Sequence, residues 1–259
     1  AKGLSLGVNF IYYFGTMNRL RKVYFPDSSA TYINSNLENR IKVSDLAFDL
    51  GAQYAYTMKS GLVLNAGLTF AFDNKMNARR EYIANTFQGS IGGNENFLDT
   101  VAYSPEEKGY ILVPAHMGLG LVLEDPGHWL IGADYDFQNW QKFEMFGYQD
   151  SLMNSFEVRV GGQYRPDNSS TASIWKRMTF RAGARYSQLP LMFRNQQINE
   201  FGISFGFSLP LRRSRSTFNF GFEFGRRGTT EQELVQENFI KFNFGISLYE
   251  RWFIKYRYQ

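Results

Sequence analysis

The sequence predicts an all-β protein: an antiparallel transmembrane β-barrel to which this chain contributes ten strands. Three observations lead to this prediction. Apolar side chains recur at every second residue, the alternating stretches are roughly nine to thirteen residues long, and the connections between them alternate between short and long. Strands of that length suit a tilted membrane crossing, whereas strands of globular proteins are nearer five or six residues.

Alternation with a period of two residues identifies strands because successive side chains point to opposite faces. We take each alternating stretch as one strand whose apolar row faces lipid. Read at every second residue, the ten apolar rows are Leu4 to Phe14, Leu46 to Tyr56, Leu62 to Phe72, Ile111 to Leu123, Trp129 to Phe137, Phe156 to Tyr164, Met178 to Tyr186, Phe201 to Leu209, Phe218 to Phe224 and Ile240 to Leu248.

The connections indicate which end of each strand faces the periplasm. Short turns follow the second, fourth and eighth strands, at residues 59–61, 125–127 and 211–216. The longest connections, 15–42 and 73–109, follow the first and third strands. Outer-membrane barrels have short periplasmic turns and longer extracellular loops. We therefore expect the two longest connections to be extracellular loops, and the loop at 73–109 to be either a solvated cap over the pore mouth or a region that binds a ligand or a partner.

The composition excludes several protein classes. The mean hydropathy is -0.35 and no stretch of about 18 apolar residues occurs, so membrane-spanning helices are not expected. The net charge of +4 is spread without a long basic run, which argues against a nucleic-acid partner. The chain has no cysteine, so disulfides and thiolate metal sites are impossible.

The face opposite the apolar rows is polar and carries both signs of charge. An Arg or Lys facing lipid near mid-bilayer would cost about 2–4 kcal/mol, so these residues must face the lumen. A glycine also occurs on this face of nearly every strand, either to relieve crowding and allow curvature or to leave room for a ligand or a plug. The lumen-facing candidates for ligand binding are His116, Asp134, Asp136, Arg159, Arg181, Arg185 and Glu223.

Three stretches carry a family resemblance: residues 2–15, 222–230 and 248–255. Together they resemble an outer-membrane protein group common in Bacteroidota, which is similar to the long-chain fatty acid transporter (OmpP1-type) barrels. The resemblance implies a bacterial outer-membrane location and a fourteen-stranded barrel with an N-terminal plug. On that basis residues 1–259 form a single barrel domain, the C-terminal portion, without the plug and the first strands. No ligand-binding motif of the family matches here.

The sequence gives little support for an enzymatic function. Asp134 and Asp136 share a face, as paired carboxylates of an outer-membrane protease would, but His128 lies in a predicted periplasmic turn and His116 lies in mid-strand. A Ser–His hydrolase and a metal site lack the required spacing. We expect that the chain is not an enzyme and that it binds no cofactor.

Two functions remain. The first is a transport-type barrel that passes or captures a hydrophobic or amphipathic small molecule. The second, which the resemblance also allows, is a non-transporting barrel subunit of an outer-membrane protein assembly or secretion complex. The expected partners are the lipid bilayer and, in the second case, other outer-membrane barrels or surface lipoproteins.

Overall fold

A computed structural model describes residues 3–25, 33–89, 93–167, 169, 172–211 and 216–249. Almost all regular structure in these residues is antiparallel β-strand, which confirms the all-β prediction. The helical pieces are η1 (Trp140–Lys142), α1 (Ile174–Arg177) and η2 (Glu231–Glu233). The strands are β1 (Leu4–Val23), β2 (Asn34–Thr57), β3 (Val63–Ala71), β4 (Asn74–Gln88), β5 (Asn96–Val113), β6 (His116–Asp125), β7 (Trp129–Gln138), β8 (Glu144–Met145), β9 (Tyr148–Gln149), β10 (Ser155–Tyr164), β11 (Thr179–Phe193), β12 (Gln196–Pro210), β13 (Thr217–Arg227) and β14 (Glu237–Ser247).

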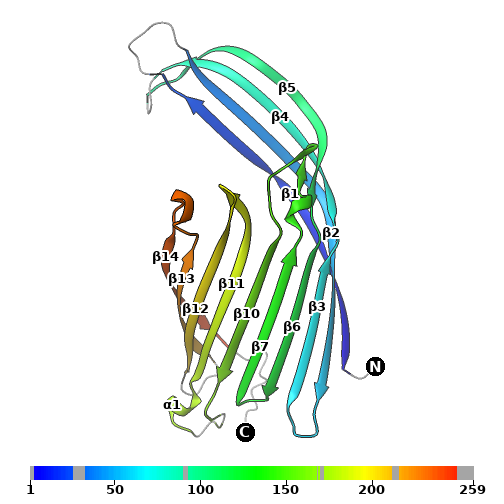
Figure 1. The fold of residues 1–259 in the computed structure, drawn as a ribbon, viewed down its shortest axis with the longest axis vertical. Coiled ribbons are helices and arrows are strands. Elements are labelled where there is room, and N and C mark those ends of the chain that lie inside the picture. Colours follow the sequence, from blue (N-terminus) through cyan, green and yellow to red (C-terminus); the bar gives the residue numbers. More distant parts are fainter. Residues whose placement is uncertain are drawn as a thin grey trace, which may run out of the picture.

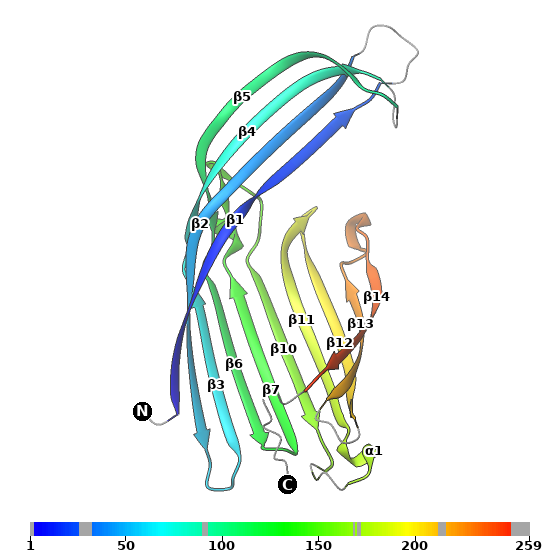
Figure 2. The same ribbon diagram turned by 180° about the vertical axis from the view of Figure 1, so that it is seen from behind.

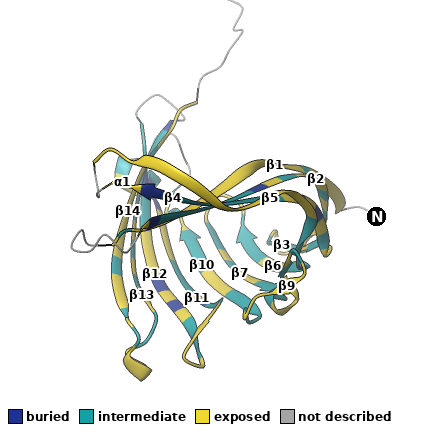
Figure 3. Cartoon of the chain, turned by 90° about the horizontal axis from the view of Figure 1, so that it is seen from above, coloured by how far each residue is buried: buried dark blue, intermediate teal, exposed yellow. Residues whose placement is uncertain are grey.

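Ten strands form a curved sheet that we call the wall. Its order is β1–β2–β3–β6–β7–β10–β11–β12–β13–β14, and every neighbouring pair is antiparallel. Nine of the ten apolar rows each lie largely on one of these strands, and the row from Ile111 to Leu123 is divided between β5 and β6. Seen from above, the wall curves around a concave space (Figure 3). Within the described residues β1 and β14 are not paired with each other, so the wall is an open sheet here.

The register keeps apolar residues together on the convex face. Leu68 pairs with Leu119, Tyr135 pairs with Val158, and Phe205 pairs with Phe222 across neighbouring strands. These side chains are exposed or half-buried in the isolated chain. A one-residue slip would move every one of them to the concave face, so the pattern itself fixes the register.

A second region, which we call the projection, rises from one end of the wall and arches over the concave space (Figures 1 and 2). It consists of the upper halves of β1 and β2 with β4 and β5. The lower part of β2 pairs with β3 over Asp49–Thr57, and its upper part pairs with β4 over Asn34–Val43. A single 24-residue strand therefore belongs to both regions.

The projection corrects the expectation of two long loops. Within 15–42 and 73–109, most described residues continue as strands. They lack the alternation of a lipid-facing strand because both faces carry polar side chains, as in Asn36, Asn39, Arg40, Arg79 and Arg80. A four-stranded sheet in water does not need one continuous apolar face, so the pattern that revealed the wall missed it.

Two further boundaries differ from those predicted. The row from Ile111 to Leu123 is interrupted at Pro114, so residues before Pro114 end β5 and those after it start β6. Proline lacks the N–H that a central strand needs. The strand that carries the predicted row from Met178 to Tyr186 is longer than that row, because β11 continues to Phe193 before the chain turns back at Arg194 and Asn195, both with positive φ.

The base of the projection is tied to the wall by the segment between β7 and β10. The Asp73 carboxylate accepts hydrogen bonds from the Ala115 backbone N–H at 2.7 Å and from Lys142 Nζ at 3.0 Å. The short β8 strand adds to the edge of β5, and the Phe146 ring lies 4.8 Å from the Arg80 guanidinium carbon. The projection is thus anchored on more than its shared strands.

Parts of several sequence signals lie outside the described residues: Lys2 and residues 250–255 of the resemblance, and residues 212–215 of the predicted turn. In the described residues, no helix is long and apolar enough to cross a membrane.

Candidate functional site

The seven candidate residues lie on five wall strands and share the face opposite the apolar rows. Asp134 and Asp136 are on β7, Arg159 is on β10, and Arg181 and Arg185 are on β11. His116 on β6 and Glu223 on β13 complete the set. The register brings neighbours among them together, because Asp134 is opposite Arg159 and Arg159 is opposite Arg185.

A first ion cluster forms on β6, β7 and β10. The Arg159 guanidinium bonds the Asp136 carboxylate and lies 3.1 Å from Glu157 Oε1. His116 Nε2 is 3.4 Å from Asp136 Oδ1. The Asp134 carboxylate makes no hydrogen bond or ion pair with any described residue, since Arg159 turns to the other two carboxylates.

A second ion cluster forms on β11 to β14. Arg185 bonds Glu200 and lies 2.7 Å from Glu223 Oε1. Glu200 is almost fully buried and also bonds Arg227, while Lys241 Nζ lies 3.6 Å from Glu223. The candidate set left out Glu200 and Arg227. The cross-strand pairing of Glu200 with Arg227 joins them, and that pairing becomes evident only once the β12–β13 register is known.

Arg181 is held differently from the other lumen arginines. Its Nε donates to Gln163 Oε1 at 2.9 Å and its Nη1 donates to Ser208 Oγ at 2.6 Å. Ser208 in turn hydrogen-bonds Asn219. Both partners of Arg181 are neutral, so among the described residues no carboxylate neutralises this guanidinium.

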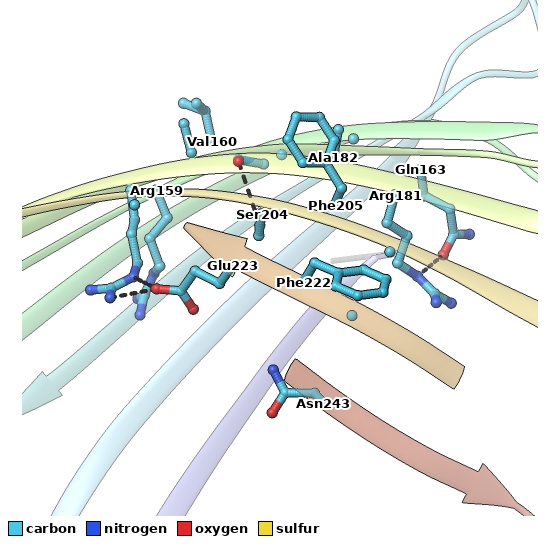
Figure 4. Close-up of a pocket in the computed structure, with 18 of the residues that line it drawn as sticks. Arg159, Val160, Gln163, Arg181, Ala182, Ser204, Phe205, Phe222, Glu223 and Asn243 are labelled. Atoms are coloured by element: carbon cyan, nitrogen blue, oxygen red, sulfur yellow. Dashed lines mark hydrogen bonds and ion pairs between the residues drawn. The ribbon is translucent and has the colours of Figure 1, made fainter. Parts of the chain in front are cut away.

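Two adjoining cavities lie on the concave face. The larger has a volume of about 770 Å³ and is lined by Asp134, Arg159, Arg181 and Arg185 among others (Figure 4). The smaller, of about 540 Å³, lies against β2, β3 and β6 and shares Asp134 and Arg159 with it. Glycines give the acids room: a Cβ on Gly120 would lie 2.7 Å from Asp134 Oδ1.

The convex face has a Phe-rich flank over β12 to β14. Ring centroids of Phe207 and Phe220 lie 4.9 Å apart, and those of Phe222 and Phe242 lie 5.1 Å apart. In the middle of β3, β6 and β7 the same face carries leucine and alanine, as in Leu121 opposite Ala133, and aromatic residues such as Phe70 and Tyr135 lie nearer the C-terminal ends of β3 and β7. The two flanks offer different shapes to whatever contacts them.

The remaining histidine lies outside the two ion clusters. His128, the second histidine, lies in the turn before β7 with its Nδ1 3.3 Å from Asp125 Oδ2. Among the described residues, no three His, Cys, Asp or Glu side chains are placed to hold a metal ion. What the concave face offers is a set of fixed charges around a hollow.

Comparison with known proteins gives one family and one fold. The family model described as BamG matches residues 1–259. The structure is similar to the crystal structure of a Pseudomonas aeruginosa FadL homologue, with a TM-score of 0.51 and 15% sequence identity over 88% of this chain. The match covers 56% of that homologue, so the chain spans little more than half of its length. A comparison with curated proteins finds no match.

Proposed function

The chain belongs to the BamG family, and from this membership we propose that it is a barrel subunit of an outer-membrane protein-assembly complex. The observation that carries the proposal is the family match, which extends over the whole sequence. The fold is that of an outer-membrane barrel of the FadL type, and the proposed location is the bacterial outer membrane. In this role the chain needs neither a cofactor nor catalytic residues, and it does not bind nucleic acid.

Two surfaces support a partner role. The projection extends beyond the wall as a sheet of its own (Figure 1). The Phe-rich flank adds a second surface, because aromatic residues are enriched where proteins pack together. We propose that other outer-membrane barrels contact the flank within the bilayer, and that surface lipoproteins contact the projection.

Affinity purification of the full-length protein from its native membranes in mild detergent tests the assembly role. We expect a defined complex with another barrel in fixed stoichiometry. Replacing Phe242 and Phe244 by alanine should release that barrel, whereas the matched replacement of Leu119 and Leu121 on the other flank should retain it. Recovery of the protein alone, with and without mild cross-linking, would refute the proposal.

Transport of a hydrophobic or amphipathic small molecule is the second candidate. The FadL-type fold and the 770 Å³ cavity on the concave face favour it. Deletion of the gene should then slow uptake of a radiolabelled hydrophobic compound, and filling the cavity through Gly161→Val should reproduce the defect. Unchanged uptake in both strains would exclude this function.

A further inference from the structure

We propose that the larger cavity binds an elongated dipolar molecule, with a cationic group at Asp134 and an anionic group at Arg181, and that a short zwitterionic peptide has this chemistry. The inference concerns the concave face alone and does not depend on the assembly role. It rests on two charged groups that line the cavity, Asp134 and Arg181, neither of which has an oppositely charged partner among the described residues.

The two ends of the cavity differ in the charge that is left without an opposite partner. At one end Arg159 pairs with Asp136 and Glu157, and Arg185 pairs with Glu200 and Glu223, so that the Asp134 carboxylate is left without a cation. Asp134 lines the cavity and is exposed, and its carboxylate bonds nothing among the described residues. A carboxylate in that position favours an ammonium group, which supplies three donors and a positive charge.

The other end is cationic. Arg181 is held by Gln163 and Ser208, neither of which carries charge. Arg165 lies on the same side, since its Nε donates to the hydroxyl of Thr179, two residues before Arg181. Partial enclosure strengthens the attraction of a guanidinium for a carboxylate or phosphate, because less water screens the charges. Figure 4 shows Arg159 and Arg181 toward opposite ends of the hollow.

The length of the molecule follows from the sheet geometry. Asp134 on β7 and Arg185 on β11 both lie opposite Arg159 of β10, which runs between them. Arg181 is four residues from Arg185 along β11. With about 3.3 Å per residue and about 4.8 Å between strands, the two Cα atoms are about 16 Å apart. An extended tetrapeptide places its terminal ammonium and carboxylate about 13 Å apart, which suits the gap once the two side chains reach inward.

The floor between the two ends has no side chains to obstruct such a molecule. Gly132, Gly161 and Gly183 are cross-strand neighbours one level below Asp134, and all three line the cavity. A Cβ added to Gly161 meets its nearest atom at 3.4 Å, which is ordinary contact, so a larger side chain there would occupy the cavity without breaking the sheet.

Calorimetric titration of the full-length protein in detergent micelles tests the proposal, with tetra-alanine as the probe. The peptide with free termini should bind, and acetylating its amine or amidating its carboxylate should each weaken binding about tenfold. Di-alanine, which spans about half the distance, should bind less tightly than tetra-alanine.

Variants of the protein test which residue of the cavity recognises which terminus of the peptide. Asp134→Asn should abolish the discrimination against the acetylated peptide and keep that against the amidated one, and Arg181→Gln should do the reverse. Gly161→Val should remove binding, and Asp150→Asn, in an exposed loop, should change nothing. Heat-dependent gel mobility verifies that each variant is folded. The proposal is overturned if folded wild-type protein does not bind tetra-alanine at millimolar concentration, if blocked peptides bind equally well, or if neither Asp134→Asn nor Arg181→Gln alters the discrimination.

Discussion

The wall and the projection share two strands, β1 and β2, yet they distribute polar side chains differently. Along the lower half of β2 the convex face carries Leu46, Phe48 and Leu50, whereas along the upper half the same face carries Arg40 and Glu38. The change marks where the strand leaves the apolar environment. The backbone hydrogen bonding of the sheet is therefore the same in both surroundings, and only the outward-facing side chains must match the medium around them.

The ion pairs of the two regions also differ in how far they are exposed to water. In the wall Arg185 and Glu200 face the concave space, and Glu200 is almost fully buried. In the projection Arg40, Glu38 and Glu81 form a half-exposed ladder on the convex face. The first group is the more shielded from water, because Arg185 is 24% exposed and Arg40 is 38% exposed, so the first group should contribute more to stability.

The largest contrast should come from placing a charge on the convex face of each region. Leu121 in the wall is 56% exposed and Leu20 in the projection is 53% exposed, so the two sites are matched in accessibility. Leu121→Arg should lower the free energy of unfolding by about 2–4 kcal/mol, because the charge enters the bilayer. Leu20→Arg should change it by no more than about 0.5 kcal/mol. Urea unfolding in lipid vesicles measures both, and equal losses would erase the distinction between the regions.

A smaller contrast is expected from the ion pairs. Arg185→Ala leaves Glu223 without its nearest cation and removes one of two partners of buried Glu200, and should cost about 1–3 kcal/mol. Arg40→Ala on the projection should cost at most about 0.5 kcal/mol. The same unfolding assay applies. If Arg40→Ala costs as much as Arg185→Ala, screening does not separate the two regions.

The base of the projection should respond to pH. The Ala115 N–H and the Lys142 ammonium hold the pKa of the Asp73 carboxyl below its usual value. A lowered pKa means that the stabilisation is present above the unfolded value of about 3.9 and is lost as the pH falls through the folded value. Hydrogen exchange of β4 and β5 amides should therefore accelerate at low pH relative to amides of β10. In Asp73→Asn the extra acceleration should disappear, and its persistence would assign the effect to another group.

The smallest effect is expected at Glu106. Lys42 and Arg79 lower the pKa of its carboxyl, but all three side chains are well exposed on the projection. Glu106→Gln should leave the unfolding midpoint unchanged within error at physiological salt, because exposed pairs are screened. A clear downward shift of the midpoint would show that the projection is less hydrated than its surface indicates.

Sequence periodicity predicted the wall well because lipid imposes a continuous apolar row on every strand. The predicted rows from Leu4 and from Phe201 coincide with β1 and β12 for this reason. The projection was predicted as loops, because residues such as Asn39 and Arg79 satisfy a sheet in water without alternation. The break at Pro114 was visible in the sequence but was overridden by the regular row around it.

The sequence predicted which residues lie on the concave face but not which of them form ion pairs with one another. Alternation placed Asp134, Arg181 and Arg185 on one face, but which acid neutralises which base depends on register and rotamer. Glu200 bonds two arginines and Asp134 bonds none among the described residues, although both are acids on similar strands. Such differences come from cross-strand neighbours, which a single sequence does not specify.

Site-directed spin labelling tests most directly whether lipid contacts the convex face of the wall. The chain has no cysteine, so single cysteines can be introduced without background. With the protein in bilayers, labels at Ile203 and Phe205 should collide readily with oxygen, which partitions into lipid, and a label at Ser204 between them should collide with a water-soluble nickel complex. Labels at Lys42 and Val43 on the projection should both favour the nickel complex. If neighbouring wall positions show no alternation, or show it with the opposite phase, the assignment of lipid to the apolar rows is wrong.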